Sequence, residues 1–246
     1  MSRSRYWVLF VCGTVLVACT KQPSTAVSQT SVDLTPATSG SSEAASEPPA
    51  ESSLAIKRGV ATVAADRVTF RLCEDNVDLW LIDQTDGGFE EATGPRGTSS
   101  AMYYLEANGE RGPALQDPPA ARAYAGTFSL EQVLYAAPQA QLQGCDAPAA
   151  EYVVLARGHD PDWSVQIDED KATWQGADHK DVALGAPQTQ DAEGTAQYDT
   201  NSNGHKMDLL VAAQPCKDAA TNEYYAYAAK AVFDGKTFIG CARVGK

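Results

Sequence analysis

Residues 163–174 read Trp-Ser-Val-Gln-Ile-Asp-Glu-Asp-Lys-Ala-Thr-Trp, and this stretch decides the fold class. Large apolar side chains at Trp163, Val165 and Ile167 alternate with polar ones, which is the period of a strand with one buried face. The acidic residues 168–170 interrupt the alternation, which then resumes as a return strand. The stretch therefore predicts an antiparallel β-hairpin in which Trp163 is a core residue.

Similar short apolar runs recur on both sides of this hairpin, separated by breaks rich in Gly, Pro and Asp. Asp234-Gly235 is a strong hairpin signal between two of them. Short strands at this spacing predict a mainly β protein with two small antiparallel barrel or sandwich modules. A short helical turn is the alternative at 130–134. The further strand candidates are 68–72, 77–82, 101–107, 121–128, 132–136, 152–155, 195–198, 206–212, 224–233 and 237–243.

The composition of the chain is acidic. Its 246 residues include 19 Lys and Arg against 32 Asp and Glu, which gives a formal net charge of −13. Nucleic-acid binding is disfavoured, because it depends on clustered Lys and Arg contacts to phosphate. The sequence shows no arrangement of a nucleophile with a nearby base. We therefore expect a non-enzymatic protein without a cofactor or a bound metal.

Residues 1–18 have the layout of an export signal. Two arginines precede the apolar run 6–15, which is too short to span a membrane. The run leads into Leu16-Val17-Ala18-Cys19, which resembles the lipobox of bacterial lipoproteins. The resemblance implies cleavage before Cys19 and acylation of its thiol and new N-terminus by chains such as palmitate. Thr20 in place of Asp implies sorting to the outer membrane, and the alternative is an ordinary cleaved signal peptide.

A lipidated cysteine and a linker, residues 19–56, are expected to precede the modules. About two-thirds of the linker is Ser, Thr, Ala or Pro, and such a composition predicts a disordered tether. The alternative is a segment that binds or spans the cell wall. Alternation begins at Lys57, and the Ala- and Pro-rich stretch 146–150 is a plausible boundary. These positions predict modules at 57–148 and 149–246.

Four cysteines remain for the modules, namely Cys73, Cys145, Cys216 and Cys241. An even number in an exported chain indicates structural disulfides. A metal or redox site is the alternative, but the chain has no Cys-x-x-Cys and no His at zinc-finger spacing. Three pairings are possible. One disulfide in each module, Cys73–Cys145 and Cys216–Cys241, is favoured.

The C-terminal stretch 152–245 resembles an uncharacterised family of bacterial envelope lipoproteins. The resemblance rests on Arg-Gly-His-Asp-Pro-Asp-Trp-Ser-Val at 157–165, Cys216-Lys217-Asp218 and the ending Gly-Cys-Ala-Arg at 240–243. Members typically carry a Gly-x-Glu-Pro-x-Trp-like start, a later Cys-x-Asp-x-Met-Ser and a terminal Gly-Cys. This chain has Asp160 in place of Glu and Ala220-Thr221 in place of Met-Ser, so any binding role of Met-Ser does not carry over.

The first module resembles more weakly the C-terminal OB-like domain of the NlpE lipoproteins. The matching residues are Asp-Arg-Val-Thr-Phe-Arg-Leu-Cys at 66–73, with Leu105-Glu106 downstream. The resemblance implies an OB-like barrel over 57–148. NlpE is linked to surface sensing and copper stress, but its metal-associated Cys-x-x-Cys belongs to another domain. No copper role is therefore implied for this chain.

Two polar stretches each allow a functional and a plain structural interpretation. Asp199-Thr200-Asn201-Ser202-Asn203-Gly204 matches the start of an EF-hand-like calcium loop. Leu210 stands where the loop needs its bidentate Glu, so a tight β-turn is favoured. Residues 168–170 likewise favour a solvated hairpin tip over a cation site.

Side chains with possible surface chemistry are few. His159 and Asp160 form a weak candidate for acid–base work, and the favoured interpretation is that they shape a turn. The tyrosines 224, 225 and 227 resemble an aromatic ligand patch, but core packing or cross-strand pairing is favoured.

Together these features predict an outer-membrane-anchored periplasmic lipoprotein with a non-enzymatic binding, sensing or envelope-maintenance role. Its expected partners are the membrane, through the anchor, and another envelope protein or a cell-wall hydrolase. The alternative function is an inhibitor or immunity protein against a lysozyme-like hydrolase, because acidity steers a protein toward cationic enzymes. A third possibility, an enzyme acting on envelope material, depends on His159 and Asp160 alone.

Overall fold

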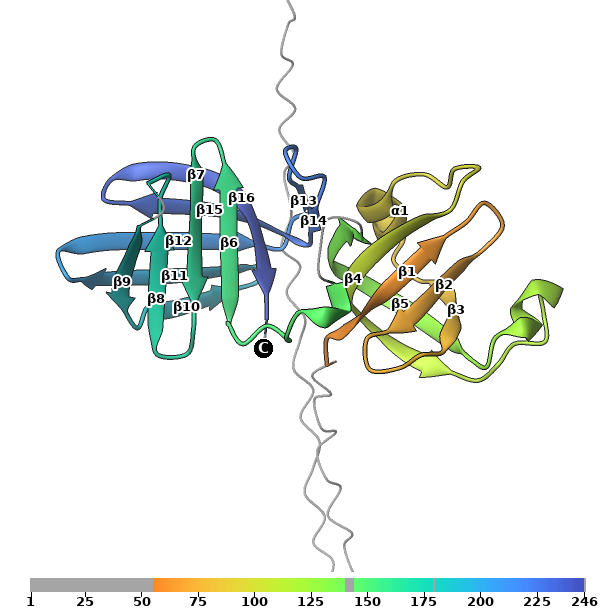
Figure 1. Ribbon diagram of the computed structural model, residues 1–246. Helices are drawn as coiled ribbons and strands as arrows, with labels where there is room; N and C mark the ends of the chain where they lie inside the picture. The colour runs from red at the N-terminus through yellow and green to blue at the C-terminus, as the bar shows by residue number, and fades with distance from the viewer. Residues whose placement is uncertain (1–54, 140–143, 179, 246) are drawn as a thin grey trace, which may run out of the picture. The chain divides into compact units, whose positions relative to one another are not determined.

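The computed structural model describes residues 55–139, 144–178 and 180–245 (Figure 1). The predictions for the signal peptide, Cys19 and the linker up to residue 54 lie outside these ranges. Glu51–Lys246 forms one compact unit, and the protein is mainly β, as predicted. In the described part of the chain, no helix is long and apolar enough to cross a membrane.

The first module is a closed barrel of five strands. Around the barrel the order is β1-β2-β3-β5-β4, and β4 pairs again with β1. β3 and β5 run parallel, and the other neighbours are antiparallel. The strands are β1 (Lys57–Val63), β2 (Val68–Leu72), β3 (Asp78–Asp83), β4 (Ala101–Gly112) and β5 (Thr127–Pro138).

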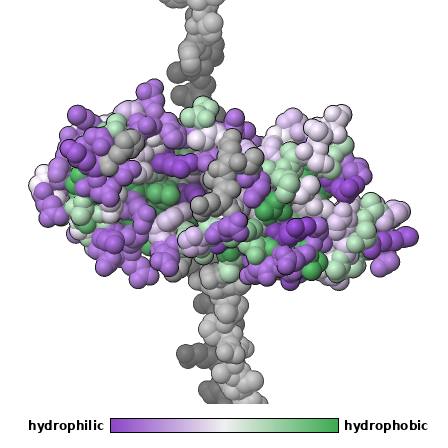
Figure 2. Space-filling view, viewed as in Figure 1, coloured by the Kyte–Doolittle hydropathy of each residue, from purple (hydrophilic) through white to green (hydrophobic). Residues whose placement is uncertain are grey.

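The alternation in β2 builds the barrel core. Val68, Phe70 and Leu72 are buried on its inner face, as predicted, and the rings of Phe70 and Phe128 lie 4.6 Å apart between centroids. The short helix α1 (Gly88–Thr93) packs Phe89 against the same core. These inner side chains leave the alternate residues of β1 to β4 on the outer face. In the space-filling view, hydrophilic and hydrophobic residues are mixed over the visible face of the molecule (Figure 2).

The second module is a nine-stranded antiparallel sheet that curls on itself (Figure 1). Its order is β10-β11-β12-β15-β16-β6-β7-β8-β9. The strands are β6 (Val154–His159), β7 (Asp162–Ile167), β8 (Lys171–Gln175), β9 (Asp181–Gly185), β10 (Gln188–Ala192), β11 (Thr195–Ser202), β12 (His205–Ala212), β15 (Tyr227–Phe233) and β16 (Lys236–Val244).

Side chains, not a backbone ladder, connect β9 to β11 where the sheet curls. The backbone N–H of Gly185 donates to Ser202 Oγ at 2.6 Å, and Asn203 Nδ2 donates to the Ala183 carbonyl at 2.9 Å. Inside the curl, Trp163 stacks on Trp174 with ring centroids 5.5 Å apart. The predicted β7–β8 hairpin and the core position of Trp163 are confirmed.

Two strand assignments from the sequence need correction, and one open alternative is excluded. Residues 119–123 form a 3₁₀ turn, so the strand expected at 121–128 begins only at Thr127. The helical turn considered at 130–134 is absent, because β5 continues through it as one strand. The strand expected at 224–233 is two strands, β14 (Tyr224–Tyr225) and β15, and they belong to different sheets.

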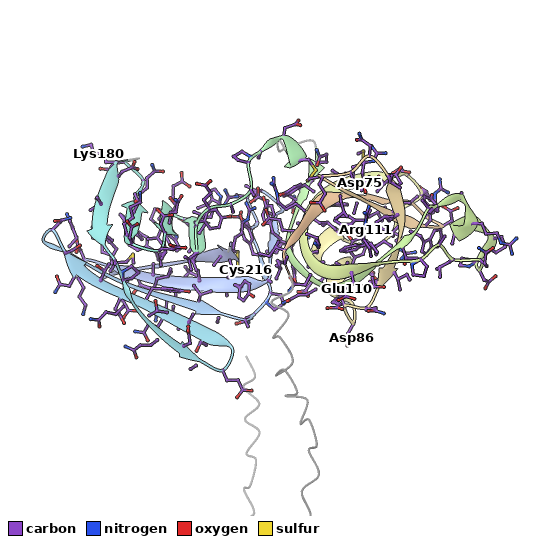
Figure 3. The ribbon with its side chains drawn as sticks, turned by 90° about the horizontal axis from the view of Figure 1, so that it is seen from below. Asp75, Asp86, Glu110, Arg111, Lys180 and Cys216 are labelled. Atoms are coloured by element: carbon purple, nitrogen blue, oxygen red, sulfur yellow. A yellow bond between two sulfur atoms is a disulfide. The ribbon has the colours of Figure 1, made fainter. Side chains whose placement is uncertain are left out.

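A segment of the C-terminal half completes the sheet of the first module. β13 (Cys216–Lys217) pairs with β14, and β14 pairs with β5, where Tyr225 lies opposite Tyr135. The sequence boundary after residue 148 therefore does not separate the two sheets completely. Figure 3 labels Cys216, which begins this segment.

Both disulfides have the favoured pairings. Cys73–Cys145 links positions within the range of the first module. Cys216–Cys241 joins β13, in the first sheet, to β16, in the second. Although both of its cysteines lie in the C-terminal half, this second disulfide thus connects the two sheets.

Two similar Arg–Tyr–Glu triads lie between the sheets. In the first triad, Arg58 Nε donates to the Tyr104 hydroxyl at 2.7 Å, and that hydroxyl donates to Glu106 at 3.0 Å. In the second, Arg157 Nε donates to the Tyr225 hydroxyl at 2.7 Å, and Arg157 also pairs with the Glu223 carboxylate. With Tyr135 and Arg243, we call these residues the junction network.

Arg243 connects the triads. Its guanidinium lies 3.9 Å from the centroid of the Tyr135 ring and pairs with Glu106, whose side chain is only 7% exposed. The pair joins β16 of the second sheet to β4 of the first. Arg243 Nε is buried without a hydrogen-bond partner among the described residues, so the Glu106 pair and the Tyr135 ring are the contacts through which Arg243 holds β16 against the barrel.

Glu223 makes the stability of the protein sensitive to acid. Burial by itself would raise the pKa of Glu223, but hydrogen bonds from Tyr225 and Arg157, with the charge of Arg157, lower it below its ordinary value. Its ionised form therefore contributes stability above the unfolded-state pKa of about 4.3, and this contribution is lost as the pH falls toward the folded-state pKa. Urea midpoints between about pH 2.5 and 6 should depend less on pH in Glu223→Gln. The exposed control Glu131→Gln should match the parent chain, and an unchanged profile in Glu223→Gln would contradict this assignment.

Candidate functional site

The outer face of the barrel carries two rows of side chains across its strands. The pairing register places Met102, Thr62 and Thr69 in one row, which continues to Trp80. Val60, Arg71 and Asp78 form the neighbouring row. Strand alternation alone brings these side chains to one surface, because their chain neighbours face the core.

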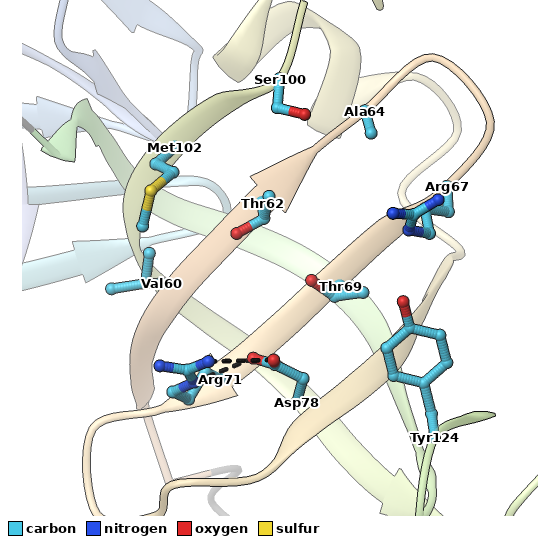
Figure 4. A pocket seen from close by; sticks show the side chains of 10 residues that line it. All are labelled: Val60, Thr62, Ala64, Arg67, Thr69, Arg71, Asp78, Ser100, Met102 and Tyr124. Carbon is cyan, nitrogen blue, oxygen red and sulfur yellow. Dashed lines mark hydrogen bonds and ion pairs between the residues drawn. The ribbon is translucent and has the colours of Figure 1, made fainter.

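A pocket of about 290 Å³ lies on this face (Figure 4). Its lining combines hydroxyl groups, two arginines and exposed apolar side chains, and none of its lining residues is His, Cys or Lys. The lining residues are Val60, Thr62, Ala64, Arg67, Thr69, Arg71, Asp78, Ser100, Met102 and Tyr124. We call it the barrel pocket.

Carboxylates balance the guanidinium charges at the barrel pocket. Arg71 Nε and Nη2 each lie 2.9 Å from an oxygen of Asp78, and this hydrogen-bonded pairing raises the pKa of Arg71 (Figure 4). Arg67 Nη1 lies 3.0 Å from Asp66. The pocket thus offers donors and acceptors without a large net charge, which suits a neutral polar ligand.

Apolar groups border the polar ones. Met102 is 53% exposed and offers an apolar surface at the edge of the pocket. Tyr124 lies beside Trp80, with ring centroids 5.7 Å apart. Such alternation of hydroxyls, guanidiniums and aromatic faces matches ligands that have both polar edges and apolar faces, such as sugars.

The sequence-predicted pair His159 and Asp160 lies elsewhere, in the second module. His159 is held between two carboxylates, with Nδ1 3.1 Å from Asp162 and Nε2 3.1 Å from Asp218. Asp160 is exposed in the turn between β6 and β7. The contact with Asp218 joins segments far apart in sequence, and this arrangement shapes a turn and anchors a loop.

Asp218 orders the loop that follows β13. Its Oδ1 accepts hydrogen bonds from the backbone N–H groups of Ala220 and Thr221 at 2.8 and 3.2 Å. Its side chain is 7% exposed. The Asp of the Cys-x-Asp stretch therefore has a structural role in this chain.

The Gly–Trp and Gly–Cys stretches of the C-terminal half meet in one place. Trp163 Nε1 donates to the Ile239 carbonyl at 3.2 Å. A Cβ on Gly158 would lie 2.4 Å from both of these atoms, and a Cβ on Gly240 would lie 1.9 Å from the Arg157 carbonyl oxygen. These glycines allow β6 and β16 to approach each other. Close packing of the two strands therefore explains Gly158, Trp163 and Gly240.

The stretch 199–204 forms the end of β11 and the tight turn that leads into β12. β11 ends at Ser202, and Asn203 and Gly204 turn the chain with φ values of 55° and 82°. Across the described ranges, no three His, Cys, Asp or Glu side chains are placed to hold a metal ion. Tyr224 and Tyr225 are buried, in the barrel core and the junction respectively, and Tyr227 packs against the core of the second module.

The residues of the barrel pocket were not singled out by the sequence as a site. The sequence predicts a polar face for residues 68–72, because Thr69 and Arg71 alternate with apolar residues. What was missing was the register that brings Asp78 and Met102 beside them. Comparison of the chain with protein-family models, with curated proteins and with solved structures finds no match.

Proposed function

We propose that the protein is an outer-membrane-anchored periplasmic lipoprotein that binds or senses an envelope component and is not an enzyme. The barrel pocket carries this proposal, since paired guanidiniums, hydroxyls, the exposed Met102 and the half-buried Tyr124 converge there. The ligand class that this surface fits best is an envelope glycan.

The topology of the barrel supports this choice of ligand. The strand order β1-β2-β3-β5-β4 with parallel β3 and β5 is that of OB-fold barrels. Such barrels bind oligosaccharides or oligonucleotides on the face of their second and third strands. The barrel pocket lies over β1 and β2 and reaches β3 at Asp78, so it overlaps this face in part. A net charge of −13 disfavours the oligonucleotide.

The lipobox-like stretch supports placement at the outer membrane, and the two disulfides suit an oxidising compartment. Cys19→Ala should abolish labelling by a palmitate analogue and release the protein from the membrane fraction. Thr20→Ala is the matched control and should retain both. A Cys19→Ala protein that is still labelled would contradict the proposed anchor.

Glycan binding is tested by co-sedimentation with purified peptidoglycan, using the chain from Thr20 onward. Arg71→Gln should weaken binding about tenfold or more, because a hydrogen bond to a charged group contributes about 1.5–3 kcal/mol. Tyr124→Ala should also weaken binding, because it removes an aromatic face from the barrel pocket. Arg111→Gln is the matched control, since Arg111 pairs with Asp75 on the barrel but outside the pocket (Figure 3). Exposed pairs of this kind contribute only about 0–1 kcal/mol to stability, so both arginine variants should remain folded.

The chain from Thr20 onward also serves to test the alternative function, inhibition of a lysozyme-like hydrolase. Stoichiometric inhibition of a lysozyme in a turbidity assay, unchanged in Arg71→Gln, would favour the inhibitor over the glycan-binding protein. We expect no inhibition.

A further inference from the structure

A second pocket on the barrel lies beside α1 and has a volume of about 400 Å³. Its walls come from the turn before α1, from α1 itself, from β5 and from the segment around β13 and β14. Three carboxylates line it, those of Asp86, Glu91 and Glu131, and none of the described residues that line it is Lys, Arg or His. We call it the acidic pocket.

The carboxylates of the acidic pocket have no counter-ion on the protein. Within the described ranges, no Lys, Arg or His nitrogen lies within 4.0 Å of the Asp86, Glu91 or Glu131 side chain. All three residues are exposed. The barrel pocket differs in this respect, because its arginines are paired with carboxylates. A cationic ligand in the acidic pocket would relieve the repulsion between these like charges.

Tyr224 brings a polar group without a partner to the same pocket. The residue is only 5% exposed, and its ring belongs to the barrel core. Among the described residues its hydroxyl has no hydrogen-bond partner, yet it is not one of the unpartnered polar atoms that are closed off from solvent. Burial and the charge of Glu91 both raise the pKa of Tyr224, which places the hydroxyl near that carboxylate. A ligand in the acidic pocket can therefore reach it.

The spacing of the carboxylates narrows the class of cation. In the described part of the chain, no three His, Cys, Asp or Glu side chains are close enough together to hold one metal ion. Carboxylates that are spread over a pocket fit an organic cation whose charges are spread as well. Val133, Ala213 and Pro215 also line the pocket, and they offer contacts for methylene groups between such charges.

We propose that the acidic pocket binds a linear polyamine. One ammonium group donates to the Tyr224 hydroxyl oxygen and pairs with Glu91, and the others pair with Asp86 and Glu131. The methylene groups between them pack on the apolar lining. The site is separate from the barrel pocket, and the proposal does not depend on glycan binding.

The test is a calorimetric titration of the chain from Thr20 onward, which contains the compact unit Glu51–Lys246. Low ionic strength keeps the screening of exposed charges small. The probes are spermidine, cadaverine, butylamine and calcium chloride. Spermidine should bind saturably, cadaverine more weakly, and butylamine at least about tenfold more weakly than spermidine, because each exposed ion pair contributes up to about fivefold.

Three results of the titration would overturn the proposal. Butylamine that binds as tightly as spermidine would overturn the choice of a polyamine. Calcium that binds more tightly than spermidine would replace it by a metal ion. The absence of saturable spermidine binding would overturn the site.

Single variants test the contacts. Tyr224→Phe keeps the ring in the core and removes only the hydroxyl, so it should weaken spermidine binding at least about threefold through the loss of one hydrogen bond. Glu91→Gln should weaken it similarly. The matched control is Glu90→Gln, which removes the same charge from the neighbouring, exposed position of α1 outside the pocket. Undiminished binding in Tyr224→Phe or in Glu91→Gln would overturn the proposal.

Two triple variants distinguish a site from general attraction to an acidic protein. Asp86→Asn with Glu91→Gln and Glu131→Gln should abolish saturable binding. The second triple variant makes the same change in net charge at exposed positions outside the pocket, and it should bind within about twofold of the parent chain, because salt screens distant charges. Its substitutions are Glu90→Gln, Glu110→Gln and Glu169→Gln. Equal losses in the two triple variants would overturn the site.

Discussion

Replacing Glu106 by glutamine is expected to lower the free energy of unfolding by about 3–5 kcal/mol. The Glu106 side chain is 7% exposed, and its partner Arg243 is 20% exposed. Without the carboxylate, Arg243 retains a mostly buried charge above Tyr135 with no ionic partner. Urea denaturation followed by circular dichroism measures the change. Glu110→Gln, at an exposed position of the same strand, should stay within about 0.5 kcal/mol of the parent chain.

A double variant distinguishes an unpaired charge from a general packing defect. Glu106→Leu with Arg243→Met removes both charges and fills the space with apolar side chains. Such replacements of a buried pair are often neutral or stabilising, so the double variant should recover most of the loss. If Glu106→Gln cost no more than Glu110→Gln, the junction network would not hold the sheets together as described.

Removing the Cys216–Cys241 disulfide by serine substitution is expected to cost about 3–4 kcal/mol on the chain-entropy model, given its sequence separation of 25 residues. It should also separate the unfolding of the two modules, because this disulfide ties β13 of the first sheet to β16 of the second. The control is Cys73→Ser with Cys145→Ser, whose separation of 72 residues predicts a loss of about 4–5 kcal/mol. The control loss should be centred on the barrel.

Tryptophan fluorescence distinguishes these two outcomes. Trp80 belongs to β3 of the barrel, while Trp163 and Trp174 belong to the core of the second module. In a chain starting at Thr20, a Trp80→Phe background therefore reports the second module alone. Coincident fluorescence and circular-dichroism transitions are expected with the disulfide, and divergent ones without it. Coincident transitions in both forms would contradict a connecting role for Cys216–Cys241.

Local patterns explain which parts of the fold the sequence predicted. The hairpin at 163–174 combines strict alternation with an acidic turn, and Asp234-Gly235 supplies the positive φ values of 48° and 78° that its turn requires. The run 224–233, apolar except for Lys230, contains no sign of its division, because both of its parts are strands. Only the pairing of Tyr225 with Tyr135, far away in the chain, assigns β14 to the other sheet.

The candidate sites depend even more on contacts between distant residues. Arg71 could be placed on a polar face from its neighbours, but its pairing with Asp78 follows from the register of β2 and β3. Tyr224 is visible in the sequence only as part of an aromatic run. Its approach to Glu91, far earlier in the chain, follows from the pairing of β14 with β5. Motifs with strong local signals, such as the Gly–Trp and Gly–Cys stretches, proved to be packing elements.

The most direct test of the proposed function is an NMR titration of the chain from Thr20 with a soluble N-acetylglucosamine oligomer. Glycan binding at the barrel pocket predicts saturable shifts of the backbone amides of Thr62, Thr69 and Arg71, lost in Arg71→Gln and kept in Arg111→Gln. Shifts that appear only in the second module, or that persist in Arg71→Gln, would contradict the account.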